Sequence, residues 1–561
     1  MAIIVRTAAF SLALLLASQG ISTSQLDSAP DSALQSHIKY VFVIYQENHS
    51  FDNYFGTYPH AENLGTALAH AHGFRQYDSI GKQWVTPFRI TDPDISGPSQ
   101  SRDVAIAKIH DGAMDNFVSE QERVSLAKNL DPADAQAAGL VTMAHYDCDT
   151  LPFLWKYARY FTLFDRFFQA MTAPSTPGNV EILAAQAGQT QWAHHPDQSS
   201  ANPEGLGDPL VNDLDPAYGP YPPSSKAKAV QIPQRYATLP LTFAGTDNAK
   251  ATHETSDVAE DLAAIARSGR TPLPWGWYQE GYVSPHEALP GYVAHHNAPQ
   301  YFAYLRNNDV YWSHIHPLPQ ILAQLHNGTL PDRGVFYIKG GSRNGFGWKP
   351  ANPDPMVQAE YRGDDDHPGP GDADHQVGEA FVATFVNAIA RSKYWNDSAI
   401  VITWDDAGGF YDHVPPPHFE RCADGNPCGD GQRLPLLLIS PYAKNGAVIH
   451  DTGDTGSIVK FIETVFDLPA LASLPDEKPY LPEGPRDADP ALTNLAGAFD
   501  IARLNGSTAP LPAALAEIPD MIVGAFPPPM SCSSLGITPI VPGETSNAPP
   551  PGFQPRAEHG K

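Results

Sequence analysis

Four short apolar runs constrain the fold of this chain most strongly. They lie at 40–45 (YVFVIY), 334–338 (GVFYI), 399–404 (AIVITW) and 434–439 (LPLLLI). Such continuous runs are typical of strands that are buried on both faces. Amphipathic helix patterns lie among them, at 151–160, 257–267, 378–391 and 456–466. Apolar strands that alternate with helices predict an α/β fold with a mainly parallel central sheet flanked by helices.

The domain organisation follows from the lack of a clear break. The chain has 561 residues, which is long enough for several domains. No internal repeat and no clean linker divides it, so we predict a single domain over residues 38–535. The polar, proline-rich stretch 188–240 predicts a large loop insertion. Residues 540–561 predict a flexible C-terminal tail.

The N-terminus has the pattern of a signal peptide. Arg6 precedes the apolar stretch 8–17, and small residues follow it. Because a stretch of about ten residues is too short to span a bilayer, we predict cleavage after residues 1–24, and a secreted or periplasmic protein. The alternative is a membrane anchor. No later stretch is apolar enough for stable membrane insertion. The net charge of −27, without a dense Lys/Arg run, argues against nucleic acid as a partner.

The chain has four cysteines, and an exported protein favours disulfides. Cys422 and Cys428 bracket the turn sequence ADGNP, which predicts a local bridge. Cys148 and Cys532 would then tie the C-terminal region to the body. A zinc site is the alternative, but no CxxC spacing supports it.

Two of the predicted strands end in oxygen-rich pairs. Glu47 and Asn48 follow the run at 40–45, and Asp405 and Asp406 follow the run at 399–404. Ligands collect outside the carboxyl ends of strands in α/β sheets. Carboxylate and amide oxygens suit a hard divalent cation. The alternative is that these residues are solvated loop residues or helix caps.

A serine precedes a strong helix-forming segment. Ser175 lies in TAPSTPGN, and residues 180–187 follow as the helix former. Free backbone N–H groups at a helix start favour a phosphate, and a serine beside a metal is an activated nucleophile. An ordinary N-cap serine is the alternative.

Several histidines stand in polar or turn contexts and are therefore candidates for the site. A histidine can bind a metal, hold a phosphate oxygen or protonate a leaving group, although many are structural. The candidates are His295, His296, His367, His413 and His450.

Seven segments, in order from about residue 38 to residue 470, resemble the bacterial phosphoesterase family of phospholipases C and acid phosphatases of the A type. They are 44–56 (IYQENHSFDNYFG), 111–117 (DGAMDNF), 146–162, 174–179 (PSTPGN), 295–297 (HHN), 403–417 (TWDDAGGFYDHVPPP) and 440–446 (SPYAKNG). The segment 174–179 is similar to the family's P-[ST]-x-P-N pattern with one extra residue, Gly178.

The resemblance implies an alkaline-phosphatase-like fold and a phosphoserine intermediate on Ser175. It implies one divalent metal ion held by four residues, Glu47, Asn48, Asp405 and Asp406. Four oxygen ligands suit Ca²⁺, Mg²⁺ or Mn²⁺, whereas an added histidine would favour Zn²⁺ or Fe. We expect the proton donor to be among His295, His296, His367 and His413. We expect Asn179 and His450 to bind the substrate.

The chain departs from the family pattern at two positions, because Gln100 and Thr455 stand where relatives usually carry histidine. The substrate is a small phosphate ester or a phospholipid head group. Only about ninety residues, rich in Pro and Ala, follow the motifs, so we expect no pair of small C-terminal β domains like those of family phospholipases C, and this expectation favours phosphomonoesters and an acid-phosphatase-like activity. The alternatives are a phospholipase C acting on phosphodiesters and an inactive ligand-binding relative.

Overall fold

The computed structural model describes residues 31–195, 210–222, 233–245, 256–306, 308–359, 362–369, 373–417, 429–481, 484–542 and 548–556. The predicted signal peptide lies outside the described residues. So does the predicted bridge between Cys422 and Cys428.

An eight-stranded sheet forms the centre of the molecule, in the order β11-β8-β12-β1-β13-β14-β6-β15. Neighbouring strands are parallel throughout, except that β14 is antiparallel to both of its neighbours. The predicted mainly parallel sheet is therefore confirmed. The strands are β1 (Tyr40–Gln46), β6 (Thr162–Phe164), β8 (Trp275–Gln279), β11 (Ile315–Pro317), β12 (Gly334–Lys339), β13 (Ser398–Trp404), β14 (Leu436–Ile439) and β15 (Ala447–Ile449).

The register of the three central strands aligns their carboxyl ends. Tyr45 of β1 pairs with Lys339 of β12 on one side and with Thr403 of β13 on the other. Gln46 pairs with Trp404. The residues that follow β1 and β13 therefore emerge at one level, at the same edge of the sheet.

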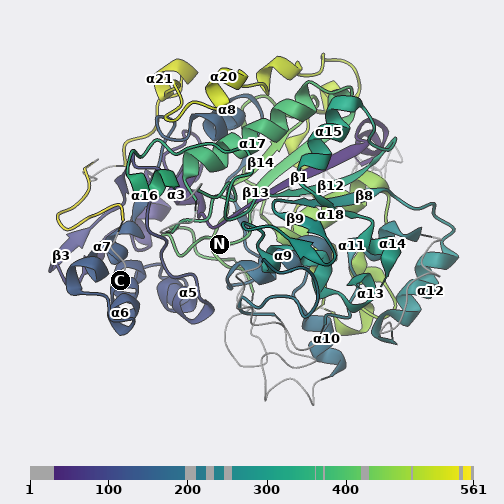
Figure 1. Ribbon diagram of the computed structural model, residues 1–561, viewed down its shortest axis with the longest axis horizontal. Helices are drawn as coiled ribbons and strands as arrows, with labels where there is room; N and C mark the ends of the chain where they lie inside the picture. Colours follow the sequence, from purple (N-terminus) through teal and green to yellow (C-terminus); the bar gives the residue numbers. More distant parts are fainter. Residues whose placement is uncertain are drawn as a thin grey trace, which may run out of the picture.

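Helices cover both faces of this sheet (Figure 1). On one side α8 and α15 contact α17, and on the other side α9 contacts α11 and α18. These helices are α8 (Pro152–Tyr160), α9 (Ser175–Ala184), α11 (Leu239–Phe243), α15 (Pro319–Asn327), α17 (His375–Ala390) and α18 (Thr455–Phe466). All four predicted helices are present, the fourth being α12 (Ala259–Arg267).

A smaller group of helices lies beside the carboxyl edge of the sheet, at the lower left of Figure 1. It consists of α5 (Arg102–Ile109), α6 (Phe117–Ala127) and α7 (Pro132–Val141), with the hairpin of β2 (Gln76–Asp78) and β3 (Gln83–Val85) against them. The remaining α-helices are α3 (Phe51–Phe55), α4 (Ala67–Ala71), α10 (Gln189–His194), α13 (Ala303–Arg306), α14 (Asp309–Trp312), α16 (Pro355–Ala359), α19 (Ile501–Leu504), α20 (Asp520–Val523) and α21 (Cys532–Leu535).

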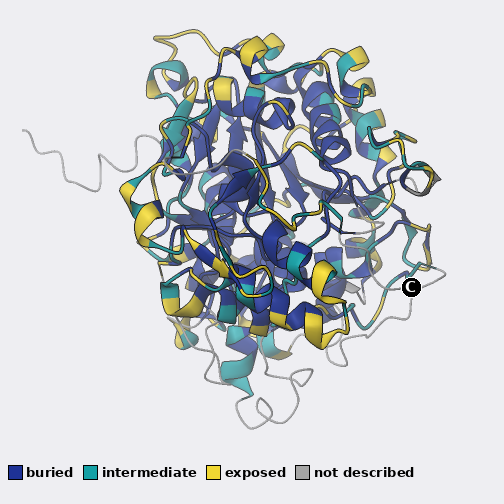
Figure 2. Cartoon of the chain, turned by 90° about the vertical axis from the view of Figure 1, so that its left-hand side faces the viewer, coloured by how far each residue is buried: buried dark blue, intermediate teal, exposed yellow. Residues whose placement is uncertain are grey.

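Burial explains why the strand runs are apolar without alternation. Every residue of β1, β12, β13 and β14 is buried. Figure 2 shows these central strands as buried, with exposed segments at the periphery. A strand covered by helices on both faces has no solvent side, so polar residues appear only where it ends.

A disulfide, hydrogen bonds and ring packing tie the C-terminal region to the body. The predicted bridge between Cys148 and Cys532 is confirmed, with a Cα–Cα distance of 4.8 Å. Within the predicted tail, the ring of Phe553 packs against Phe88 at a centroid distance of 5.0 Å. Among the described residues, we find no helix with the length and apolarity needed to cross a bilayer.

Candidate active site

The four predicted metal ligands and Ser175 converge at the carboxyl edge of the sheet. Ser175 Oγ lies 3.1 Å from Glu47 Oε2, 3.3 Å from Asn48 Oδ1 and 3.0 Å from Asp406 Oδ2. All of these side chains are buried. Residues that are far apart in the sequence therefore surround one hydroxyl group.

Backbone geometry brings the two ligand pairs together. Asn48 adopts a left-handed conformation with φ 60°, which turns the chain just after β1. Gly408 has φ +62°, and a Cβ atom there would lie 2.1 Å from the Asn48 carbonyl oxygen. Only glycine tolerates both this φ and this contact, so the Gly-Gly turn after β13 lets the two strand-end loops touch.

Helix α9 begins at Ser175 and approaches the end of β13 very closely. A Cβ atom on Gly178 would lie 2.4 Å from the Asp405 carbonyl oxygen. Tyr45 Oη donates a 2.8 Å hydrogen bond to the Gly178 carbonyl, and Asn179 Nδ2 donates a 2.9 Å hydrogen bond to Asp405 Oδ2. The N-cap is Pro174, so Ser175 is not an ordinary N-cap serine, and the Thr176 backbone N–H in the first turn donates a 2.9 Å hydrogen bond to Asp213 Oδ1. The Ser175 hydroxyl faces the acidic cluster instead.

A buried lysine that the sequence reasoning missed completes the cluster. Lys339 Nζ contacts Glu47 Oε1 and lies 3.5 Å from Asp405 Oδ2. Burial opposes its charge, but Asp405 and Glu47 hold the pKa of Lys339 above its ordinary value. The signal was available, because Lys339 is a polar residue at the end of a buried strand, just as Glu47 and Asp405 are.

The carboxylates of the cluster outnumber its lysine. Glu47, Asp405 and Asp406 face a single Lys339. Burial, followed by the charge of Glu47, raises the pKa of Asp405 to about 7. Burial and then Asp405 raise the pKa of Asp406 well above its usual range. These three carboxylates therefore resist ionising together unless a further cation lies among them.

The donor set fits a divalent metal ion. The Asn48 amide either turns its Nδ2 to Glu47 Oε2 and Asp405 Oδ1 and donates to both, or turns its Oδ1 to them at 2.8 Å, in which case an oxygen faces two oxygens. A cation bound between them would satisfy all three. His296 Nε2 lies 3.1 Å from Glu47 Oε1, and ligand atoms of Glu47, His296 and Asp405 all lie within 4.8 Å of one another. With His296 within reach, nitrogen-preferring metals fit the site as well as oxygen-preferring ones.

Three of the five candidate histidines lie at this cluster. His296 contacts Glu47 directly, and the ring of His295 stands edge-on to His296 at 4.5 Å. His367 Nε2 lies 3.4 Å from Gln100 Nε2. Gln100 in turn accepts a hydrogen bond from Asn48 Nδ2 through its Oε1. Gln100 therefore joins a predicted metal ligand to His367, in the place where family members usually carry histidine.

The other two candidate histidines lie in separate clusters. His413 Nδ1 is 2.7 Å from Asp52 Oδ2 and its Nε2 is 3.2 Å from Glu62 Oε1, in a buried network with Arg433. His450 is bonded to Asp165 at 2.8 Å, and its side chain is 61% exposed. The structure therefore does not bring His413 or His450 to Ser175.

The second departure from the family pattern also lies in another cluster. Thr455 is the first residue of α18, and Asp454 is the N-cap of that helix. Asp454 Oδ2 lies 2.9 Å from Arg486 Nη2, and this ion pair is buried.

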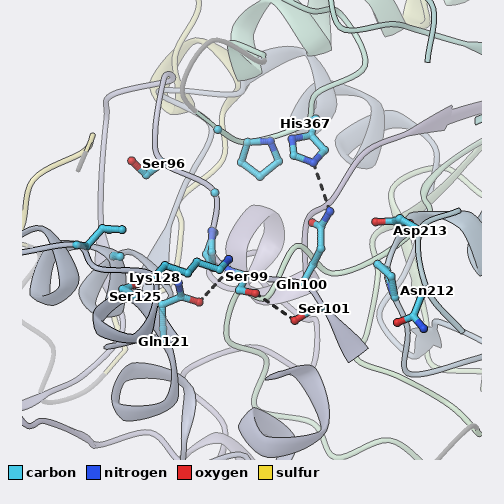
Figure 3. Close-up of a pocket in the computed structure, with 17 residues that line it drawn as sticks. Ser96, Ser99, Gln100, Ser101, Gln121, Ser125, Lys128, Asn212, Asp213 and His367 are labelled. Atoms are coloured by element: carbon cyan, nitrogen blue, oxygen red, sulfur yellow. Dashed lines mark hydrogen bonds between the residues drawn. The ribbon is translucent and has the colours of Figure 1, made fainter. Parts of the chain in front are cut away.

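A cavity of about 600 Å³ adjoins the cluster. Pro174, Gln100 and His367 line it on the side of Ser175. Figure 3 shows Gln100 and His367 between the α6 side chains on one side and Asn212 and Asp213 on the other. Ser175 itself is buried, and its neighbour Pro174 is the residue of that segment that lines the cavity.

Comparisons with known proteins agree with this arrangement. Non-hemolytic phospholipase C of Burkholderia pseudomallei is 23% identical over 512 residues, which cover 85% of this chain and 61% of that protein. Phospholipase C B of Mycobacterium tuberculosis is 32% identical over 99 residues, 14% of this chain and 19% of that protein. The chain thus spans less than two thirds of the length of these relatives.

Solved structures show a weaker similarity. A phosphonate monoester hydrolase from Silicibacter pomeroyi aligns over 57% of this chain and 69% of its own, at 13% identity and a TM-score of 0.24. A TM-score of that size does not establish a shared fold by itself. The model of the Phosphoesterase family, in contrast, matches residues 38–469, which include all the clustered site residues. The chain belongs to the phosphoesterase family.

Proposed function

We propose that this protein is a secreted, metal-dependent phosphoric ester hydrolase that acts through a phosphoserine on Ser175. One observation carries the proposal: the Ser175 hydroxyl, at the first turn of a helix, lies within 3.0–3.3 Å of side-chain oxygens of three predicted metal ligands, Glu47, Asn48 and Asp406. The first turn of a helix favours an anion, and here Asp213 Oδ1 accepts one of its N–H groups, from Thr176 at 2.9 Å. An inactive binding protein would have no need for this arrangement.

In the proposed reaction, Ser175 Oγ attacks phosphorus, and the bond from phosphorus to the ester oxygen breaks. A divalent ion held by Glu47, Asn48, Asp405 and Asp406 would lower the pKa of the serine and neutralise a phosphoryl oxygen. The leaving oxygen takes a proton, and water then attacks phosphorus and releases the Ser175 hydroxyl.

We assign the proton transfer to His367. It lines the cavity in which the leaving group would lie, and Gln100, its neighbour, has no acidic proton to give. General acid catalysis of this kind contributes about 10²–10⁴-fold. Asn179 has a positioning role. Its amide donates hydrogen bonds to both the Asp405 carboxylate and the Ser175 carbonyl, and so holds these two residues relative to each other.

Phosphomonoesters are the substrates that we propose first, by the acid-phosphatase resemblance. A phospholipase C activity is the second candidate, because the relative that aligns over 85% of the chain carries that name, as does one that aligns over 14% of it. Both reactions use the same attack on phosphorus and differ in whether a second ester group stays on it.

The test uses p-nitrophenyl phosphate and p-nitrophenylphosphorylcholine, with and without a chelator. We expect Ser175→Ala to abolish turnover of whichever ester the wild type cleaves while the metal content stays unchanged. The matched control is Ser533→Ala, at an exposed serine on α21. Near-normal turnover by Ser175→Ala would show that the nucleophile is another group, and turnover that survives chelation would remove the metal from the proposal.

Export of the protein is part of the proposal. The disulfide between Cys148 and Cys532 supports it, because such bonds persist in oxidising compartments. Expression of the full chain in a bacterial host, with fractionation and N-terminal sequencing, tests it. We expect the protein outside the cytoplasm with a mature terminus near residue 25, whereas an intact N-terminus in the cytoplasm would contradict export.

A further inference from the structure

The cavity beside Ser175 has mixed walls with many hydrogen-bonding groups. Its described lining combines hydroxyl and amide side chains, the charged or titratable side chains of Lys128, Asp213 and His367, and small apolar residues, and it includes no Phe, Tyr or Trp. The polar side chains of the floor and rims include Ser99, Ser101, Ser125, Gln121, Lys128 and Asn212. Larger apolar contributions come only from Leu130 and prolines. Such walls suit a ligand that carries many hydroxyl groups.

A buried lysine holds the floor of this cavity in place. Lys108 Nζ donates hydrogen bonds of 2.9 Å to the Ser99 carbonyl, 2.9 Å to Gln121 Oε1 and 3.0 Å to the Gly409 carbonyl. Gln121 Oε1 also accepts a 2.8 Å hydrogen bond from the Ser99 backbone N–H. Because Gly409 follows the metal-ligand loop, Lys108 joins the cavity floor to the catalytic edge and presents the floor as a preformed surface.

The opposite rims carry polar groups that can bind a ligand. Lys128 at the end of α6 and Asn212 are both exposed. Among the described residues, we find no hydrogen bond or ion pair from the side chain of Lys128 or of Asn212. Ser101 Oγ lies 3.3 Å from Ser99 Oγ and is also at the surface. Figure 3 shows Asn212 and Lys128 on opposite sides of Ser101.

Two familiar kinds of ester partner do not match these walls. A choline group is recognised by the faces of aromatic rings, and the described lining has none. An aliphatic chain requires walls of large apolar side chains, whereas in the described lining Leu130 is the largest and the other apolar residues are Gly, Ala and Pro. A polyhydroxylated alcohol finds both donors and acceptors.

We propose that this cavity receives the alcohol part of the substrate, and that this alcohol is polyhydroxylated, such as a sugar or a cyclitol. This inference rests on the proposed function, because it assigns the ester partner of the phosphorus that Ser175 attacks. The same chemistry occurs in a free sugar phosphate and in the head group of a phospholipid, so the test separates these two sources.

The test compares four esters with the purified full chain. Two are soluble, glucose 6-phosphate and phosphocholine, and two are presented in vesicles, phosphatidylinositol and phosphatidylcholine. We expect kcat/KM at least about tenfold higher for the polyhydroxylated member of whichever pair is cleaved, since loss of one good hydrogen bond changes binding by about that factor. If the soluble sugar ester is the better substrate, the source of the polyhydroxylated alcohol is a sugar phosphate. If the lipid in vesicles is the better substrate, the source is a phospholipid head group. Equal rates within both pairs, or a preference for choline, would overturn the inference.

Two cavity variants test the location of the preference. Asn212→Leu and Ser101→Leu replace rim polarity with apolar surface, and Asn505→Leu and Ser507→Leu make the same exchanges at exposed positions outside the cavity. We expect the cavity variants to lower the ratio of kcat/KM for the polyhydroxylated ester to kcat/KM for p-nitrophenyl phosphate by about tenfold, and the control variants to leave that ratio unchanged. Equal losses in cavity and control variants would refute the location.

Failure of the inference can be told apart from failure of the proposed function. If Ser175-dependent turnover of p-nitrophenyl phosphate is present but no polyhydroxylated ester is preferred, the inference fails and the function stands. If Ser175→Ala retains wild-type turnover, both fail.

Discussion

The close approach of α9 to β13 makes Gly178→Ala a stringent test of the active-site geometry. Gly178 lies between Ser175, the proposed nucleophile, and Asn179, which holds Asp405. A Cβ atom at position 178 would lie 2.4 Å from the Asp405 carbonyl oxygen and 3.0 Å from its carbonyl carbon. Both neighbours are backbone atoms, so no side-chain rotation can relieve the clash. The helix and the strand end must move apart.

The size of that movement sets the expected effect. Ordinary contact begins at 3.4 Å, so α9 must shift by about 1 Å. Displacement of a catalytic group by 1 Å can cost about 10²-fold in rate. We therefore expect kcat/KM to fall by about two orders of magnitude. Overpacking of a buried contact also costs about 1–3 kcal/mol of stability, which a large domain can tolerate.

The assay is steady-state hydrolysis of p-nitrophenyl phosphate, with thermal unfolding to show that the variant is folded. Gly524→Ala is the matched control, because its Cβ atom would have no neighbour closer than 3.9 Å and its φ is −88°. A folded Gly178→Ala protein with a kcat/KM within about twofold of wild type would refute the reasoning. It would mean that the site tolerates a displaced Ser175.

Three further predictions concern stability. His413 lies between Asp52 and Glu62; burial opposes its charge, but Asp52 and Glu62 raise its pKa above 6.5 in spite of Arg433. The stabilising charge on His413 is therefore fully present below pH 6.5 and is lost as the pH rises through the pKa of the folded state. The loss of unfolding free energy caused by His413→Gln should therefore become smaller between pH 6 and pH 9. A loss that stays constant over this range would contradict the prediction. A divalent ion at a hundredfold excess over its Kd should raise the unfolding free energy by about 2.7 kcal/mol, and calorimetry that shows no dependence on added metal would argue against the site. Replacing the bridged pair by Cys148→Ala/Cys532→Ala should cost roughly 2–5 kcal/mol, since the bond closes a separation of 384 residues; unchanged denaturant unfolding would contradict it.

The sheet was largely predictable from its strands. The run at 40–45 became β1 (Tyr40–Gln46) and the run at 399–404 became β13 (Ser398–Trp404). A strand that is buried on both faces needs continuous apolar residues, and such a run can be recognised in the local sequence. The direction of a strand cannot be recognised in this way. An apolar run has the same pattern in either direction, so only the paired structure shows that β14 is antiparallel.

The candidate site was predictable in part, for the same reason. Glu47 and Asp405 stood out because polar groups directly after a buried strand lie at the carboxyl edge of a parallel sheet. Lys339 occupies the same kind of position on the neighbouring strand β12. The apolar run at 334–338 stops one residue before it, so the run alone does not point to Lys339. His413 follows one metal pair by a few residues, yet its ring is bonded to Asp52 and Glu62.

The sequence by itself determined which chemical groups the chain could offer: strand-end carboxylates, a serine at a helix start and a supply of histidines. These are local properties, set by residue type and by a few neighbours along the chain. Only the tertiary structure decided that Ser175 faces both ligand pairs, that His296 and His367 join them, and that His413 and His450 do not. Distances between such residues depend on strand order, register and the glycine contacts at 178 and 408, and the periodicity of a sequence does not record them.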